Sequence, residues 1–170
     1  MSAISTTGEL SSRQFGAMTV ALKSDREVEF TRVFDAPRSL VFEAMSKSEH
    51  LKHWWGMRGA IVQECVMAFH PGGAWLCVLR ETDGSVNSFR GEYREIVAPE
   101  RIVQTFEFDG VPGAVTVDRL TLVEHDGKTT VTSIKEFPSV EARDGMLQFG
   151  MERGAAETYD RLEEYLRTIA

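Results

Sequence analysis

The feature that most constrains this chain is a succession of short segments with a two-residue period, each separated from the next by a turn. Within each segment apolar and polar residues alternate, as they do in a strand that buries one face. The turns carry proline and glycine, for example at His70–Gly73 and Asp83–Gly84. Six such segments follow one another: 60–69, 74–81, 88–97, 101–108, 114–124 and 129–137. Strands joined in this way predict an antiparallel meander.

The sequence on either side of this meander predicts one further strand and three helices. Alternation over residues 27–34 indicates the first strand, and Pro37 suits the first turn of a helix over 39–46. A second short helix follows from Ser48 and is ended by Gly56. Residues 139–169 predict one long helix, with an apolar stripe formed by Leu147, Met151, Ala155, Thr158, Leu162, Leu166 and Ile169.

This order of elements predicts the fold class α+β. The expected architecture is a curved antiparallel sheet of six to seven strands wrapped around the long C-terminal helix, with the two short helices closing one end. Because such a sheet does not close tightly on a helix, we expect a cavity between them. The folded domain is expected over residues 26–170, and residues 1–25, whose start is rich in serine and threonine, are expected to be an N-terminal extension.

Composition and net charge limit the classes of protein to which this chain can belong. The 170 residues are 42% hydrophobic and 26% charged, as in a folded globular domain, and the net charge of −7 argues against binding to nucleic acid or to an anionic membrane. Residues 1–10 lack the basic and apolar regions of a signal peptide. Cys65 and Cys77 are expected to be buried free thiols in a reducing compartment, so we expect a cytoplasmic protein.

Five segments in the same order carry a family resemblance. They are VFDAPRSLVFEAM (33–45), HLKHWWG (50–56), GGAW (72–75), GEYREIVAPERIVQTFEF (91–108) and GMERGAAETYDRLEEYL (150–166). Together they resemble the heat-shock-protein-90 ATPase activator homologue (AHSA-like) family, which belongs to the START-like, or SRPBCC, helix-grip superfamily. The resemblance covers about residues 28–166. It implies the helix-grip fold and an interior cavity for apolar ligands.

Strand alternation nominates the wall of this cavity. The adjacent Trp54 and Trp55 are placed at its mouth, one facing inward and the other packing on a neighbour or facing solvent. The candidate ligand-cavity residues are Trp54, Trp55, Trp75, Cys77, Phe89, Tyr93, Phe106, Phe108, Leu120, Gly150, Met151 and Gly154. Core packing alone would also account for most of these positions. Tyr93 is the most informative of them, because a buried hydroxyl needs a partner and could orient a ligand.

Gly150 and Gly154 lie within the predicted long helix, where a glycine costs about 0.5–1 kcal/mol relative to alanine. Two such glycines indicate either a close approach of the helix to the sheet or room for a ligand beneath it, and the sequence leaves both readings open. Gly154 lies beside the apolar stripe and is the better candidate for an interior contact.

Signatures of catalysis or metal binding are missing from the sequence. It contains no GxSxG, Walker A, HExxH or dinucleotide-binding motif. His50 and His53 are three residues apart, but no third ligand is placed to complete a metal site, so we expect a solvated pair of histidines. No metal and no cofactor are expected.

Three hypotheses for the function follow. The first is a non-catalytic module that binds an apolar small molecule in the interior cavity. The second is an enzyme of the polyketide cyclase or hydrolase kind, which the same superfamily contains and which would need polar groups in the cavity, such as Tyr93, Arg32, His70 or Glu107. The third is a co-chaperone-like module that binds a protein, suggested by the family name. A homodimer and a role in the stress response are further expectations.

Overall fold

The structure, a computed structural model, describes residues 12–170. Within these residues nine strands form one antiparallel sheet in the order β1-β2-β3-β9-β8-β7-β6-β5-β4. The strands are β1 (Ser12–Phe15), β2 (Met18–Ser24), β3 (Glu27–Phe34), β4 (Ile61–Met67), β5 (Ala74–Arg80), β6 (Val86–Val97), β7 (Arg101–Phe108), β8 (Thr116–His125) and β9 (Lys128–Glu136). The helices are α1 (Arg38–Ser46), α2 (Ser48–Leu51), α3 (Val140–Gln148) and α4 (Met151–Ile169).

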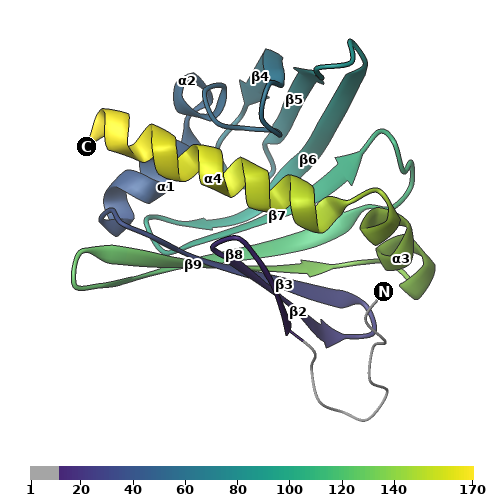
Figure 1. Ribbon diagram of the computed structural model, residues 1–170, viewed down its shortest axis with the longest axis horizontal. Helices are drawn as coiled ribbons and strands as arrows, with labels where there is room; N and C mark the ends of the chain where they lie inside the picture. The colour runs from purple at the N-terminus through teal and green to yellow at the C-terminus, as the bar shows by residue number, and fades with distance from the viewer. Residues whose placement is uncertain (1–11) are drawn as a thin grey trace.

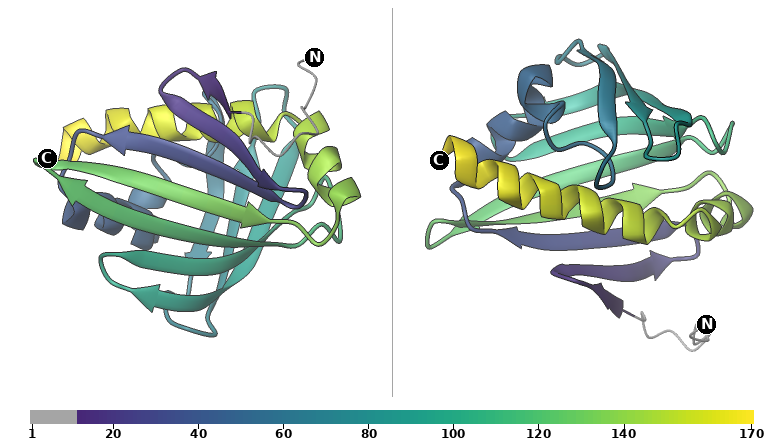
Figure 2. Two further views of the ribbon diagram at one scale, coloured as in Figure 1. Left: turned by 90° about the horizontal axis from the view of Figure 1, so that it is seen from below. Right: turned by 45° about the horizontal axis from the view of Figure 1, so that its top comes forward.

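The sheet is strongly curved, and α4 lies across its concave face (Figure 1). The short helices α1 and α2 close one end of the molecule, and α3 lies at the other end (Figure 2). This is the predicted α+β architecture, with a curved sheet gripping the C-terminal helix. The seven predicted strands correspond to β3 through β9.

The sheet contains two more strands than the sequence predicted, and both lie within the predicted N-terminal extension 1–25. β1 pairs with β2, and β2 pairs with β3, from Thr19 opposite Thr31 to Ser24 opposite Glu27. Met18 and Val20 point into the core, where both side chains are buried. Residues 12–24 therefore belong to the sheet, while the rest of the predicted extension lies outside the described residues.

The prediction of one helix over 139–169 was wrong, because the chain turns between α3 and α4. Gly150 takes a left-handed backbone conformation with φ +78°, which glycine adopts without strain and which ends a helix. Ser139 begins α3 by accepting a hydrogen bond from the backbone N–H of Ala142 at 3.0 Å. The new start at Met151 shifts the buried face of α4, so that Ala156 rather than Ala155 is buried, ahead of Leu162 and Leu166.

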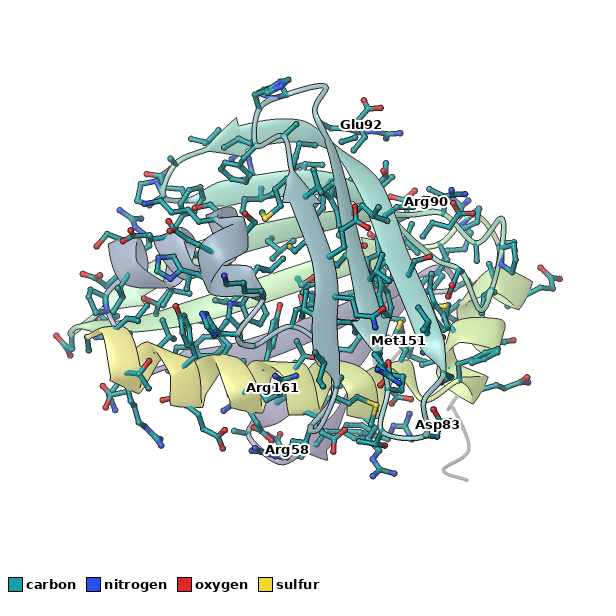
Figure 3. The ribbon with its side chains drawn as sticks, turned by 90° about the horizontal axis from the view of Figure 1, so that it is seen from above. Arg58, Asp83, Arg90, Glu92, Met151 and Arg161 are labelled. Carbon is teal, nitrogen blue, oxygen red and sulfur yellow. The ribbon has the colours of Figure 1, made fainter. Side chains whose placement is uncertain are left out.

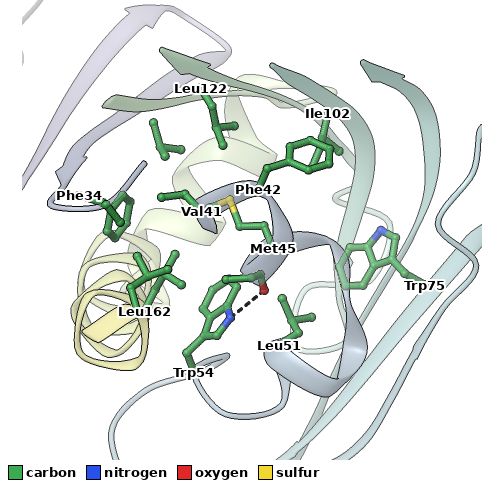
Figure 4. Packing of buried hydrophobic residues seen from close by; sticks show 14 of the residues in the cluster. Phe34, Val41, Phe42, Met45, Leu51, Trp54, Trp75, Ile102, Leu122 and Leu162 are labelled. Carbon is green, nitrogen blue, oxygen red and sulfur yellow. Dashed lines mark hydrogen bonds between the residues drawn. The ribbon is translucent and has the colours of Figure 1, made fainter. Parts of the chain in front are cut away.

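Two groups of buried side chains hold the sheet and the helices together. The larger lies between α1, α4 and the middle of the sheet, and includes Phe34, Trp54, Trp75 and Leu162 (Figure 4). The smaller lies under α3 and the start of α4, and is formed by Met18, Val20, Val28, Phe30, Phe137, Met146 and Ala156. Tyr159 contacts both groups. Tyr159, on α4, therefore joins the two groups.

The predicted alternation within strands is confirmed. On β5, Trp75, Cys77 and Leu79 are all buried. On β6, Arg90 and Glu92 point away from the core (Figure 3), and Arg90 pairs across to Glu107 on β7 at 3.0 Å. In the described part of the chain no helix is long and apolar enough to cross a membrane.

Candidate functional site

A cavity of about 60 Å³ lies between the sheet, the α1–α2 end and α4. Most of the side chains around it are apolar. They come from the strands β4 to β8, from α1, from α2 and the residues that follow it, and from α4. Its lining is Met45, Leu51, Trp54, Trp55, Met67, Trp75, Tyr93, Ile102, Gln104, Leu120 and Tyr159. A cavity of this size holds a few water molecules and is smaller than the roughly 300–1,000 Å³ of a typical ligand pocket.

The two adjacent tryptophans contribute differently to the lining, as expected. Trp54 is buried, and its indole N–H donates to the carbonyl of Ala44 on α1 at 3.1 Å (Figure 4). Trp55 is half-buried and has ring contacts with Trp75 and Phe89, each at 6.0 Å between centroids. Trp54 therefore closes the core against α1, whereas Trp55 covers the side of the cavity that faces β5 and β6.

From Trp55 a row of aromatic rings continues along the concave face of the sheet. Trp75 contacts Phe106 at 5.9 Å between centroids, Phe106 contacts Phe89 at 5.7 Å, and Phe89 stacks on Phe108 at 5.0 Å. The three phenylalanines are only half-buried. The cavity wall thus extends beyond the present cavity as an aromatic surface.

Polar atoms in the lining come from Tyr93, Tyr159 and Gln104. Burial raises the pKa of the Tyr93 phenol, with smaller contributions from Cys77 and Cys65. Burial likewise raises the pKa of Tyr159, and the charge of Asp118 adds to this. Both hydroxyls therefore stay protonated at neutral pH. Neither hydroxyl has a partner in the described chain, and neither oxygen is among the fully buried atoms that lack one, so both remain open to water or to a guest.

Charged side chains lie beneath α4, and only one of them was suggested by the sequence. Arg32 on β3 is buried and pairs with Asp160 on α4, while its Nε atom has no partner among the described residues. Lys135 on β9 pairs with Asp118 on β8 at 2.7 Å, and both side chains are less than a tenth exposed. Arg32 was named only as one of the polar groups that the enzyme hypothesis would need inside the cavity, and it does not line the cavity. Alternation with Leu120 and Val131 places Asp118 and Lys135 on the inner face. Their pairing was missed because it depends on the register of β8 against β9, which no local pattern contains.

The loop that carries Trp54 and Trp55 is held to α4 by an arginine that the sequence did not single out. Arg161 donates to the backbone carbonyls of Trp55, Gly56 and Met57 at 3.1, 3.1 and 3.0 Å. Arg58, farther along the same loop, pairs with Glu164 on α4 at 2.6 Å. Both arginines lie along α4 (Figure 3). The position of Trp55 over the cavity therefore depends on α4.

Five of the twelve candidate residues come together around the cavity: Trp54, Trp55, Trp75, Tyr93 and Leu120. Phe89, Phe106 and Phe108 form the neighbouring aromatic row. Cys77 is buried opposite Cys65 and does not line the cavity. The remaining three lie elsewhere on α4 or before it: Gly150, Met151 and Gly154.

Gly154 has neither of the interior roles considered for it. A Cβ at Gly150 or Gly154 would meet nothing within 4 Å, so neither glycine allows a close approach to the sheet, and neither lines the cavity. Met151 packs against the smaller core group instead of the cavity. The expectation failed because it assumed one continuous helix, whose stripe passes through positions 151 and 155.

Among residues 12–170 no group of three or more His, Cys, Asp and Glu side chains is arranged to hold a metal ion. The prediction of a solvated pair of histidines holds for the exposed His53 but not for His50, which is half-buried. Nδ1 of His50 lies 2.6 Å from the hydroxyl of Tyr165 on α4, and the ring of His53 stacks on the same tyrosine. They join α2 and the following residues to the end of α4.

Comparison with solved structures places this fold among known ones. A protein from Rhodobacter sphaeroides is 24% identical with a TM-score of 0.82, over 90% of this chain and 99% of that one. A protein from Nitrosomonas europaea is 21% identical with a TM-score of 0.77, over 86% and 97% of the two chains. CalU16 from Micromonospora echinospora is 16% identical with a TM-score of 0.57, over 93% and 83%. These likenesses establish the helix-grip fold. No curated protein matches the chain.

The family is established by the sequence itself. The family model described as "Activator of Hsp90 ATPase homolog 1-like protein" matches residues 35–167, from the end of β3 almost to the end of α4. The matched region contains α1, α2, α3, most of α4 and every residue that lines the cavity. This chain therefore belongs to the family of Activator of Hsp90 ATPase homolog 1-like proteins.

Proposed function

We propose that this protein binds a small molecule with an apolar body and at least one hydrogen-bond-accepting atom in the cavity between the sheet and α4. The observation that carries the proposal is the pairing of an aromatic lining with the hydroxyls of Tyr93 and Tyr159, which have no partner in the described chain. A guest that accepts from either hydroxyl replaces a hydrogen bond to water, for a net gain of about 0.5–1.5 kcal/mol. Its apolar body gains further from leaving water.

The size of the cavity indicates how such a guest would enter. About 60 Å³ is too small for a molecule of more than a few heavy atoms. Trp55 is one of the half-buried residues of the lining, and it contacts both Trp75 and Phe89. An outward movement of the Trp55 ring would join the cavity to the aromatic row of Phe89, Phe106 and Phe108. We therefore infer that the bound ligand replaces Trp55 against these rings.

The same geometry favours binding over catalysis. A general acid works best when its pKa lies near the working pH, and burial moves the pKa values of Tyr93 and Tyr159 upward, away from neutrality. Hydroxyls of this kind orient a guest by donation rather than by proton transfer. An enzyme of the cyclase kind would have to use these same groups, and a protein-binding role would need an outer surface rather than this interior.

Titration with two fluorescent probes tests the proposal. Anilinonaphthalene sulfonate carries strong acceptor oxygens, and N-phenylnaphthylamine has a similar apolar body without them. We expect both to bind saturably to the wild type. Replacing Tyr159 with Phe should weaken binding of the sulfonate by about three- to tenfold, the range expected for one hydrogen bond, and leave the amine unchanged.

A matched pair of leucine variants locates the probe. Leu120→Phe fills the cavity and should abolish binding of both probes, whereas Leu22→Phe, in the smaller core group, should leave binding intact. Thermal unfolding of each variant checks that it remains folded. Absence of saturable binding to the wild type, or unchanged binding to Leu120→Phe, would contradict the proposal and favour a protein partner.

A further inference from the structure

Two thiols lie in contact outside the cavity lining. Cys65 on β4 and Cys77 on β5 stand directly opposite each other in the antiparallel pairing, and their Sγ atoms are 3.3 Å apart. Residues opposite each other in an antiparallel pair have Cα atoms about 4.5–5.5 Å apart, and a disulfide needs about 4.4–6.8 Å. A small rotation of the side chains would therefore bring the two sulfur atoms to bonding distance, with the backbone in place.

The two cysteines differ in their access to solvent. β4 is the last strand of the sheet, and a groove of about 260 Å³ lies between it and the α2 region. The lining of this groove is Ser48, Glu49, Lys52, Val62, Gln63, Glu64 and Cys65. Cys65 is half-buried, and Cys77 is completely buried behind it. A small reagent in the groove can reach the first thiol but not the second.

We propose that Cys65 and Cys77 form a redox-active dithiol, which a peroxide entering this groove oxidises to a disulfide between β4 and β5. The site is separate from the proposed ligand cavity, whose lining contains neither cysteine. The proposal rests on the facing positions of the two cysteines, the contact of their sulfur atoms and the one-sided access.

The chemistry assigns different tasks to the two sulfur atoms. A hydrogen bond from the Cys77 thiol lowers the pKa of Cys65, and the same bond together with burial raises the pKa of Cys77. Of the two thiols, Cys65 therefore forms the thiolate, which is the nucleophilic form, more readily than Cys77. This is the arrangement of an attacking and a resolving cysteine.

The reaction balances with the peroxide as the oxidant. The Cys65 thiolate, having lost its proton to water, attacks one peroxide oxygen, so that an S–O bond forms and the O–O bond breaks. The alkoxide or hydroxide that leaves takes a proton from water. Sulfur of Cys77 then attacks Sγ of Cys65, the S–S bond forms, and hydroxide leaves with the thiol proton of Cys77 as water. The two sulfur atoms together give two electrons to the peroxide.

The experiment is direct because the chain contains only two cysteines. Reduced protein is treated with hydrogen peroxide, and its thiols are then counted with dithiobis-nitrobenzoate after denaturation. We expect both thiols to disappear together, the mass of the monomer to fall by two hydrogen atoms, and dithiothreitol to restore both. Retention of both thiols, or oxidation that gives only disulfide-linked dimers, would overturn the proposal.

The two single variants form matched controls. In Cys77→Ser, peroxide should convert Cys65 to a sulfenic acid that dimedone traps, whereas in Cys65→Ser the buried Cys77 should stay reduced. Equal oxidation of the two variants would contradict the assigned roles. Alkylation of the native wild type with iodoacetamide gives the same information without a mutation: Cys65 should react at least about tenfold faster than Cys77.

Discussion

Trp75 on β5 lies directly opposite Gly91 on β6, and its indole reaches across to β7, where the N–H donates to the carbonyl of Thr105 at 3.2 Å. A Cβ at position 91 would stand 1.9 Å from that carbonyl oxygen and 2.5 Å from the indole nitrogen. The missing side chain at Gly91 therefore allows a tryptophan of the cavity wall to span three strands.

Gly91→Ala should destabilise the protein more than any other glycine-to-alanine change discussed here. The added methyl group meets backbone as well as the Trp75 ring, so β6 or the indole must move, and we expect the free energy of unfolding to fall by about 3 kcal/mol. Urea denaturation followed by circular dichroism measures this. Wild-type stability in this variant would mean that Trp75 does not cross β6 as described.

Gly154→Ala should have the opposite effect. Position 154 lies inside α4, and a Cβ there meets nothing within 4 Å. The substitution therefore removes the cost of a helical glycine without a steric penalty, and the free energy of unfolding should rise by about 0.5–1 kcal/mol. The same urea titration provides the measurement, and probe binding should not change. A loss of stability would place this face of α4 against the sheet.

The sequence predicted seven strands correctly because their signals are local. Alternation and turn residues act over a few positions, and β3 through β9 carry both. β2 was missed because it follows a serine-rich start, although Met18 and Val20 already alternate in it. The break at Gly150 was missed because Leu147 and Met151, four apart, continue the helical spacing across it. Gly150 itself was the available signal, because glycine commonly ends a helix.

Only the apolar part of the candidate site was predicted. The polar and charged contacts were missed because they join residues that are far apart in the sequence. Alternation identifies which side of a strand faces inward, and so it found Trp75, Tyr93 and Leu120. The Arg161 clamp and the Lys135–Asp118 pair depend on segments 17 to 106 positions apart, whose alignment no local pattern contains. The hydroxyl of Tyr159 was missed because the single-helix prediction gave α4 a different inward face.

Lys135→Met tests the buried ion pair. Among residues 12–170, the ammonium group is the only charged partner in contact with Asp118, whose other oxygen accepts from the hydroxyl of Thr116 at 2.8 Å. Removing the ammonium group leaves the buried carboxylate of Asp118 uncompensated. We therefore expect a loss of about 3–5 kcal/mol in the free energy of unfolding. The double variant Lys135→Met with Asp118→Leu should recover most of this loss, as measured by urea denaturation.

A pair on the same two strands serves as the control. Arg119 on β8 and Glu136 on β9 form an exposed ion pair at 3.2 Å, so Arg119→Met should cost less than about 1 kcal/mol. If Lys135→Met costs no more than this control, the Lys135–Asp118 pair is solvated rather than buried.

Arg161→Met tests whether α4 controls the loop over the cavity. Methionine keeps the apolar stem and loses the donors, so the carbonyls of Trp55, Gly56 and Met57 lose their shared partner. Because these carbonyls can turn to water, global stability should fall by only about 1–2 kcal/mol. The local effect should be larger: amide hydrogen exchange over residues 53–60 should accelerate by about tenfold or more, and the association rate of N-phenylnaphthylamine should rise with it. Arg167→Met, at the exposed end of the same helix, is the control and should change neither rate. Unchanged exchange in Arg161→Met would show that the loop is held by its own packing, through Trp54, and that Trp55 is not released from α4.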